Sequence, residues 1–75
     1  MYTVYGRSNC AYCEKAKNLL TLKGLAFKYV DVLEKPENME AMREASPGAK
    51  TVPQIVLDGK LIGGFTELEK SLMSA

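Results

Sequence analysis

The chain has 75 residues and a mass of 8.3 kDa, so we expect residues 1–75 to form one domain near the lower size limit for independent folding. Hydrophobic residues make up 47% of it and charged residues 25%, a composition that argues against intrinsic disorder. Ten basic residues against nine acidic ones leave a net charge of +1, which gives no electrostatic attraction to nucleic acid or to an acidic membrane.

Further classes of protein are disfavoured by what the sequence lacks. No apolar run approaches the roughly 20 residues of a membrane span, and the N-terminal residues lack the features of a signal peptide, so a cytoplasmic location is expected. The absence of histidine removes the usual base of Ser/His and Cys/His catalysis. Two cysteines cannot complete a four-thiolate zinc site, so no metal ion is expected within one chain.

The first part of the chain alternates between strand and helix patterns. Residues 2–5 are aromatic or β-branched and precede Gly6, which predicts a short strand that the glycine ends. Residues 11–23 carry apolar side chains at helical spacing and precede Gly24, which predicts a helix. Residues 26–32 alternate with a period of two and predict a second strand.

The next part predicts a second helix and a hairpin. Pro36 suits the first turn of a helix, which is expected to end near residues 46–48. Short strands are predicted at residues 54–57 and 60–62 because they flank Asp58-Gly59, a strong signal for a β-hairpin turn.

The last helix is predicted from a capping box in which Thr66 is the N-cap and Glu69 follows three residues later. The order of elements is then β-α-β-α-β-β-α. Strands joined across a helix are expected to be parallel with a right-handed crossover, and the hairpin strands antiparallel. The sequence therefore predicts an α/β fold with a four-stranded mixed sheet flanked by helices.

The sequence Cys10-Ala11-Tyr12-Cys13 is the motif that carries chemistry. It follows a predicted strand and opens a predicted helix, the context in which C-x-x-C is typical of redox proteins. Cys10 is then expected beside the free N–H groups and the positive dipole end of the helix, with Arg7 adding a positive charge, and both favour a thiolate. Cys13 lies one helical turn further on and is expected to be shielded.

A thiol pKa lowered from about 8.5 to about 7 raises the thiolate fraction at pH 7 about sixteenfold. The same change lowers intrinsic nucleophilicity about fivefold, so the net gain in attack is about threefold. We therefore predict that Cys10 is the attacking thiolate and the leaving group of a mixed disulfide, and that Cys13 is the resolving thiol.

Three other interpretations of the two cysteines stay open at this point. They could be buried structural thiols, because cysteine is common in protein cores. They could form a structural disulfide, although so short a loop contributes only roughly 2 kcal/mol and a reducing cytoplasm disfavours it. They could also belong to an iron–sulfur site shared by two chains.

Two further segments gain meaning from their position. Pro53 cannot donate a hydrogen bond, so Thr51-Val52-Pro53 belongs at the start or edge of a strand, where a cis Val52–Pro53 bond is possible. Gly63-Gly64 precede the last helix, whose free N–H groups suit a carboxylate. The remaining residues are assigned to packing or solvent: Tyr29 to the sheet, with Tyr2, Tyr5 and Phe27; Met39 and Met42 to the core; Lys15 and Lys17 to a solvated helix face.

The order of these motifs resembles that of the glutaredoxins along essentially the whole chain. The motifs are Cys10-Ala11-Tyr12-Cys13, Thr51-Val52-Pro53-Gln54, Asp58-Gly59-Lys60 and Ile62-Gly63-Gly64-Phe65-Thr66-Glu67-Leu68. The spacing is similar to that of small dithiol glutaredoxins of the bacterial or phage type. The resemblance implies a thioredoxin-like fold and the reduction of protein disulfides and glutathione mixed disulfides, with glutathione as co-substrate and no tightly bound cofactor.

The resemblance also implies roles for individual residues. Cys10 would be the nucleophile and Cys13 the resolving thiol. Backbone groups of Val52 would pair with the cysteinyl part of glutathione, N–H groups of the last helix with its γ-glutamyl carboxylate, and Arg7 and Gln54 with its glycyl carboxylate. The residues that would line the glutathione site, with Pro53 in cis, are Arg7, Tyr12, Thr51, Val52, Pro53, Gln54, Gly64, Phe65, Thr66 and Glu67.

The sequence departs from the common glutaredoxin pattern at three places. Ala11 stands where proline is common, Arg7 where lysine is common, and Thr66-Glu67 where an acidic pair is usual. Two alternative functions are therefore kept: a redoxin that takes electrons from thioredoxin reductase, and a dimeric iron–sulfur carrier in which Cys10 binds the cluster with glutathione. Ribonucleotide reductase is a candidate protein substrate, and a monomer is expected.

Overall fold

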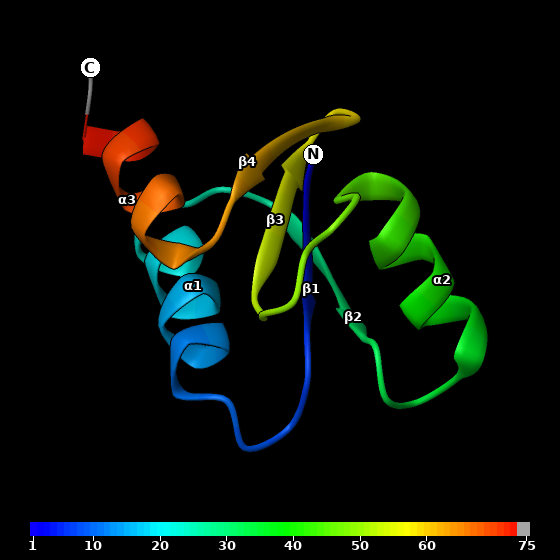
Figure 1. The fold of residues 1–75 in the computed structure, drawn as a ribbon. Helices are drawn as coiled ribbons and strands as arrows, with labels where there is room; N and C mark the ends of the chain where they lie inside the picture. The colour runs from blue at the N-terminus through cyan, green and yellow to red at the C-terminus, as the bar shows by residue number, and fades with distance from the viewer. Residues whose placement is uncertain (74–75) are drawn as a thin grey trace.

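The computed structural model describes residues 1–73, which form a four-stranded sheet and three helices (Figure 1). The elements are β1 (Tyr2–Gly6), α1 (Ala11–Leu22), β2 (Phe27–Asp31), α2 (Pro36–Ala45), β3 (Gln54–Leu57), β4 (Lys60–Gly63) and α3 (Phe65–Met73). This confirms the predicted order of elements and the predicted mixed sheet.

The strands lie in the order β2-β1-β3-β4. β1 pairs in parallel with β2, as a strand–helix–strand unit requires, and antiparallel with β3. Val4, at the middle of β1, therefore has Tyr29 on one side and Ile55 on the other. The hairpin between β3 and β4 turns at Asp58 and Gly59, whose φ angles of 49° and 85° explain why this dipeptide predicts the turn.

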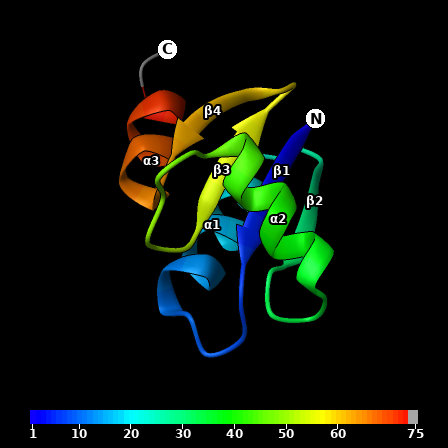
Figure 2. The same ribbon diagram turned by 45° about the vertical axis from the view of Figure 1, so that its right-hand side comes forward.

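Helices cover both faces of the sheet. α1 and α3 lie together on one face, and α2 lies on the other (Figures 1 and 2). The core fills the space between the sheet and the pair α1 and α3, and its fully buried residues include Val4, Ala16, Leu20, Ile55 and Leu68. Of the helices described, none is long and apolar enough to cross a membrane.

The start of α3 differs from the prediction. The helix begins at Phe65, and the carbonyl of Gly64 accepts its first bond, from the N–H of Leu68 at 3.0 Å. The N–H of Gly64 in turn donates to Oε1 of Glu67 at 2.9 Å, which is one half of a capping box. The predicted box of Thr66 and Glu69 is therefore wrong, because glycine occupies the cap position and Glu67 lies three residues beyond it.

Gly6 is itself the last residue of β1, so the strand ends at this glycine and is one residue longer than predicted. Its carbonyl accepts a hydrogen bond from the N–H of Val32 at 2.8 Å, which keeps it paired with the β2 side of the sheet. A glycine is needed here for another reason, which is the close approach of α1 and β2. A Cβ at this position would lie 2.8 Å from Sγ of Cys13 and 2.8 Å from the hydroxyl oxygen of Tyr29.

Packing between α1 and the sheet supplies much of the stability, and two leucines of α1 test this. Leu20 is fully buried, so Leu20→Ala is expected to lower the free energy of unfolding by about 2–5 kcal/mol. Leu22 is 83% exposed, so Leu22→Ala on the same helix is the matched control and should leave the urea midpoint nearly unchanged. Equal midpoints for the two variants would contradict this account of the core.

Candidate functional site

Cys10 is the N-cap of α1. Its backbone is extended, with φ −122° and ψ 105°, and its carbonyl accepts the first helical bond from the N–H of Glu14 at 3.2 Å. Its Sγ accepts a hydrogen bond from the N–H of Cys13 at 3.2 Å. The sulfur thus occupies the place that a serine or aspartate oxygen takes at other helix N-termini, where negative charge is stabilised.

The two cysteines form a disulfide in this structure, with Cα atoms 5.2 Å apart, and they differ sharply in exposure. Cys13 is fully buried beneath the first turn of α1, whereas Cys10 is partly exposed. This asymmetry suits one accessible and one shielded sulfur, as the sequence predicted.

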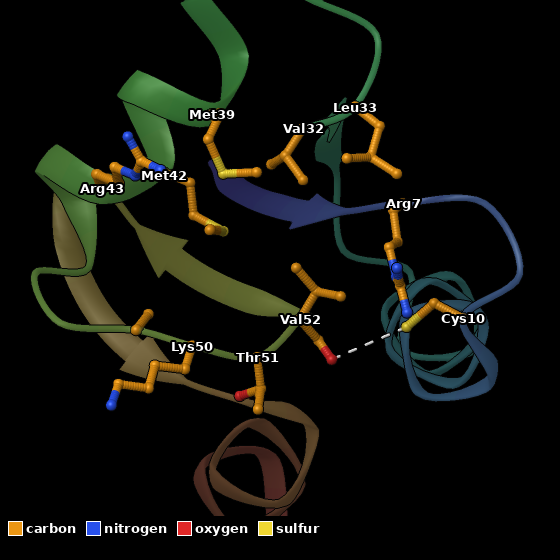
Figure 3. Close-up of a pocket in the computed structure, with 11 residues that line it drawn as sticks. Arg7, Cys10, Val32, Leu33, Met39, Met42, Arg43, Lys50, Thr51 and Val52 are labelled. Atoms are coloured by element: carbon orange, nitrogen blue, oxygen red, sulfur yellow. Dashed lines mark hydrogen bonds between the residues drawn. The ribbon is translucent and has the colours of Figure 1, made fainter. Parts of the chain in front are cut away.

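Cys10 lies at one end of a pocket of about 520 Å³ between the Thr51-Val52 loop and α2 (Figure 3). Its Sγ is 3.8 Å from the carbonyl oxygen of Val52. The sulfur carries no proton in the disulfide, so this is a packing contact here, and it becomes available as a hydrogen bond once the thiol forms. The Val52–Pro53 bond is cis.

The pocket has an apolar floor and a basic rim. Arg7 and Cys10 are at one end, and Met39, Met42 and Arg43 of α2 are at the other (Figure 3). Its lining residues include three cations and no carboxylate, which favours an anionic ligand. The complete lining is Arg7, Cys10, Val32, Leu33, Met39, Met42, Arg43, Ala49, Lys50, Thr51 and Val52.

Tyr12 and Phe65 connect the motif at α1 to the start of α3. Their ring centroids are 5.9 Å apart with a tilt of 41°, and the ammonium group of Lys15 lies 4.9 Å from the Tyr12 ring. Tyr12 is 56% exposed, so this aromatic pair presents a surface to solvent. The structure thus brings together two of the residues that the sequence analysis assigned to the site.

The N-terminus of α3 lies against the cis-proline loop. A Cβ at Gly64 would stand 3.6 Å from the carbonyl oxygen of Pro53, so the two backbones approach closely. The N–H groups of Thr66 and Glu67 are in the first helical turn, where no helical carbonyl precedes them. The carboxylate of Glu67 is already engaged by Gly64.

Gln54 occupies a different place from the one expected. It is only 8% exposed; its Oε1 accepts a hydrogen bond from the hydroxyl of Ser46 at 3.0 Å, and its Nε2 donates to the carbonyl of Thr51 at 2.9 Å. Its polar atoms are therefore engaged within the protein, and the geometry is against the direct contact with a glycyl carboxylate. Gln54 instead ties the Thr51 loop to the end of α2.

Sequence reasoning missed two groups of residues near the cysteines. The first is the α2 side of the pocket, whose Met39, Met42 and Arg43 share one helix face; their spacing of three and four residues was the available signal. The second is Tyr29 with Lys17, whose ammonium group lies 4.1 Å from the Tyr29 ring centroid. Lys17 is therefore not simply part of a solvated helix face.

The pKa of the Tyr29 hydroxyl is shifted by its surroundings. Burial raises the pKa of its hydroxyl above the usual value, and the charge of Lys17 opposes that rise. Asp31 and Glu14 raise the pKa further. The phenol therefore stays protonated, and able to donate a hydrogen bond, throughout the neutral pH range.

Comparisons with known proteins agree with this geometry. The Glutaredoxin family profile matches residues 2–62. Glutaredoxin 3 of Escherichia coli K12 is 38% identical over 65 residues, which cover 87% of this chain and 77% of that protein. Hybrid peroxiredoxin hyPrx5 of Haemophilus influenzae is 40% identical over 68 residues, 91% of this chain but only 27% of the longer relative.

A comparison with solved structures shows the same fold. A buckwheat glutaredoxin in complex with glutathione superposes with a TM-score of 0.81 at 23% identity, over 95% of this chain and 66% of that one. In this chain the C-x-x-C pair stands at the start of α1 and forms the disulfide. The chain therefore belongs to the glutaredoxin family of thiol-disulfide oxidoreductases, with Cys10 and Cys13 as its redox pair.

Proposed function

We propose that this chain, as a single glutaredoxin-like domain, uses glutathione to reduce protein disulfides and glutathione mixed disulfides. The observation that carries the proposal is the position of Cys10. Its sulfur caps α1, borders a pocket without carboxylates and is accessible, while Cys13 is buried behind it. A cytoplasmic location is part of the proposal, because a glutathione-dependent reductase needs a reducing compartment.

The chemistry proceeds by two thiol–disulfide exchanges. The Cys10 thiolate attacks one sulfur of the substrate disulfide, forms a mixed disulfide, and releases the other sulfur as a thiolate that takes up a proton. The Cys13 thiolate then attacks Cys10, forming the intramolecular disulfide and releasing the second substrate thiolate. Two glutathione molecules restore the dithiol and leave as oxidised glutathione.

The pocket and the α3 terminus suit the groups that glutathione presents. Val52 lies outside the sheet ladder, so its backbone groups are available to pair with an extended peptide. The first-turn N–H groups of Thr66 and Glu67 suit the γ-glutamyl carboxylate, and Arg7 suits the glycyl carboxylate. Tyr12 and Phe65 would cover one side of the peptide, and Thr51, Pro53 and Gly64 would form the backbone surface beneath it.

Glu67 caps the N-terminus of α3, which affects how many backbone N–H groups are free to bind a carboxylate. Its carboxylate accepts a hydrogen bond from the N–H of Gly64, which removes one backbone donor but leaves those of Thr66 and Glu67 itself.

A disulfide-containing protein would approach over the same surface as glutathione, and ribonucleotide reductase is one candidate substrate. A monomer suffices for every step of this scheme.

A coupled turnover assay tests the electron donor. NADPH consumption with a small mixed-disulfide substrate is followed with glutathione and glutathione reductase, and separately with thioredoxin reductase. We expect turnover only with glutathione, complete loss in Cys10→Ser, and substantial retention in Cys13→Ser, because Cys10 suffices for deglutathionylation. Full activity of Cys10→Ser would contradict the mechanism, and turnover with thioredoxin reductase alone would contradict the glutathione site.

The role of the Arg7 charge can be measured separately. Arg7→Gln is expected to raise KM for glutathione about fivefold, because a charge-assisted contact to a partly exposed carboxylate contributes roughly 1 kcal/mol. A change in kcat would report separately on the contribution of the Arg7 charge to the Cys10 thiolate. Lys28→Gln removes an exposed charge on β2 and is the matched control. An unchanged KM in Arg7→Gln would exclude the proposed contact.

A further inference from the structure

The missing side chain of Gly6 leaves a small space behind the active-site helix, and two functional groups share it. Sγ of Cys13 and the hydroxyl oxygen of Tyr29 each lie 2.8 Å from the point where a Cβ of residue 6 would stand. They come from α1 and β2, and they are neighbours only because residue 6 is a glycine. Since 2.8 Å plus 2.8 Å is 5.6 Å, the two atoms are at most 5.6 Å apart, and the buried sulfur has a polar group close to it.

Tyr29 is held in this position from two sides. Its hydroxyl donates to the carbonyl oxygen of Arg7 at 3.2 Å, in the loop that leads to Cys10. Its ring is covered by the ammonium group of Lys17, 4.1 Å from the centroid. Lys17 lies four residues after Cys13 on α1, so the cation is on the helix face that carries the sulfur.

The buried sulfur needs such neighbours if it is to react. The resolving step requires Cys13 as a thiolate, and burial in apolar surroundings disfavours that charge. In the step, the Cys13 thiol gives its proton to solvent, its thiolate attacks Sγ of Cys10, the Cys10–Cys13 bond forms, and the substrate sulfur leaves as a thiolate. A polar hydrogen aimed at the Cys13 sulfur and a nearby cation would both favour the reacting form.

We propose that the hydroxyl of Tyr29, together with the ammonium group of Lys17, stabilises the thiolate of Cys13 in the reduced protein and so promotes the resolving step. Tyr29 is thus a positioning residue, and this role rests on the proposed function of Cys13. In the disulfide form the hydroxyl donates to Arg7, because a disulfide sulfur is a weak acceptor. When the thiolate forms, rotation about the C–O bond turns the hydrogen toward the sulfur.

The charges around Tyr29 make the proposal testable in both directions. Lys17 and Glu14 face it from α1, where they pair at 2.9 Å, and Asp31 faces it from its own strand. Arg7 contributes its backbone carbonyl. Lys17 therefore supports a thiolate, whereas the two carboxylates oppose one. Removing Lys17 and removing Glu14 should shift the Cys13 titration in opposite directions.

The experiment titrates Cys13 alone, in a Cys10→Ser background, by the ultraviolet absorbance of the thiolate. Adding Tyr29→Phe is expected to raise the pKa of Cys13 by about one unit, and Lys17→Gln to raise it by a smaller amount. Glu14→Gln should lower it. The matched controls are Tyr5→Phe and Lys28→Gln. Tyr5 lies on β1 opposite Val30, the residue after Tyr29, so Tyr5→Phe removes a hydroxyl from the adjacent strand. Both controls should leave the Cys13 titration unchanged.

The rate of the resolving step, measured in the protein that retains both cysteines, gives a second readout. A one-unit rise lowers the rate of the resolving step about threefold, because the tenfold loss of thiolate is partly offset by greater nucleophilicity. Deglutathionylation through Cys10 and a second glutathione should be unchanged in Lys17→Gln, which leaves the hydrogen bond from Tyr29 to Arg7 in place. If Tyr29→Phe unfolds, the opposite shifts in Lys17→Gln and Glu14→Gln decide the question.

The two proposals fail in different ways. Equal Cys13 titrations in Tyr29→Phe and Tyr5→Phe, or shifts of the same sign in Lys17→Gln and Glu14→Gln, would overturn the role of Tyr29 and Lys17. The turnover of Cys10→Ser, by contrast, bears on the proposed function alone. The Cys13 titration could also shift as expected in a protein that shows no glutathione-dependent turnover. In that case Tyr29 and Lys17 stabilise the Cys13 thiolate, but glutathione is not the electron donor.

Discussion

The hydrogen bond between the N–H of Cys13 and the sulfur of Cys10 is the contact on which the site depends. It places a polarisable sulfur at the helix terminus, where free N–H groups and the helix dipole favour negative charge. It also fixes the direction of the two cysteines, one toward the pocket and one into the protein. The cap of a helix and the reactive group of the site are therefore the same atom.

The surroundings of the two sulfurs divide the site into an outer and an inner half. The outer half is the pocket of loop and α2 residues, basic at its rim, where a substrate disulfide reaches Cys10. The inner half is the space over Gly6, which Cys13 and Tyr29 share, with the ammonium group of Lys17 over the Tyr29 ring. Tyr29 connects the halves because its hydroxyl bonds to the backbone of Arg7, a residue of the pocket.

Local patterns predicted what depends on local contacts. The alternation of residues 26–32, the helical spacing of residues 11–23 and the Asp58-Gly59 turn each reflect a preference of the backbone itself, and each predicted element is present. The prediction of the capping box was wrong because local spacing alone allows more than one choice. Two overlapping pairs, Thr66 with Glu69 and Gly64 with Glu67, have the same spacing of three residues, and the second pair forms the hydrogen bond.

The sequence by itself determined the family, the redox pair and the order of the elements, because these follow from motifs in which neighbouring residues act together. Only the tertiary structure decided that Gln54 is buried against Ser46, that α2 lines the pocket, and that Tyr29 shares a space with Cys13. Those contacts join segments brought together by strand register and by the packing of helices on the sheet. Since register couples distant residues and leaves no local signature, reading along the chain could not reveal them.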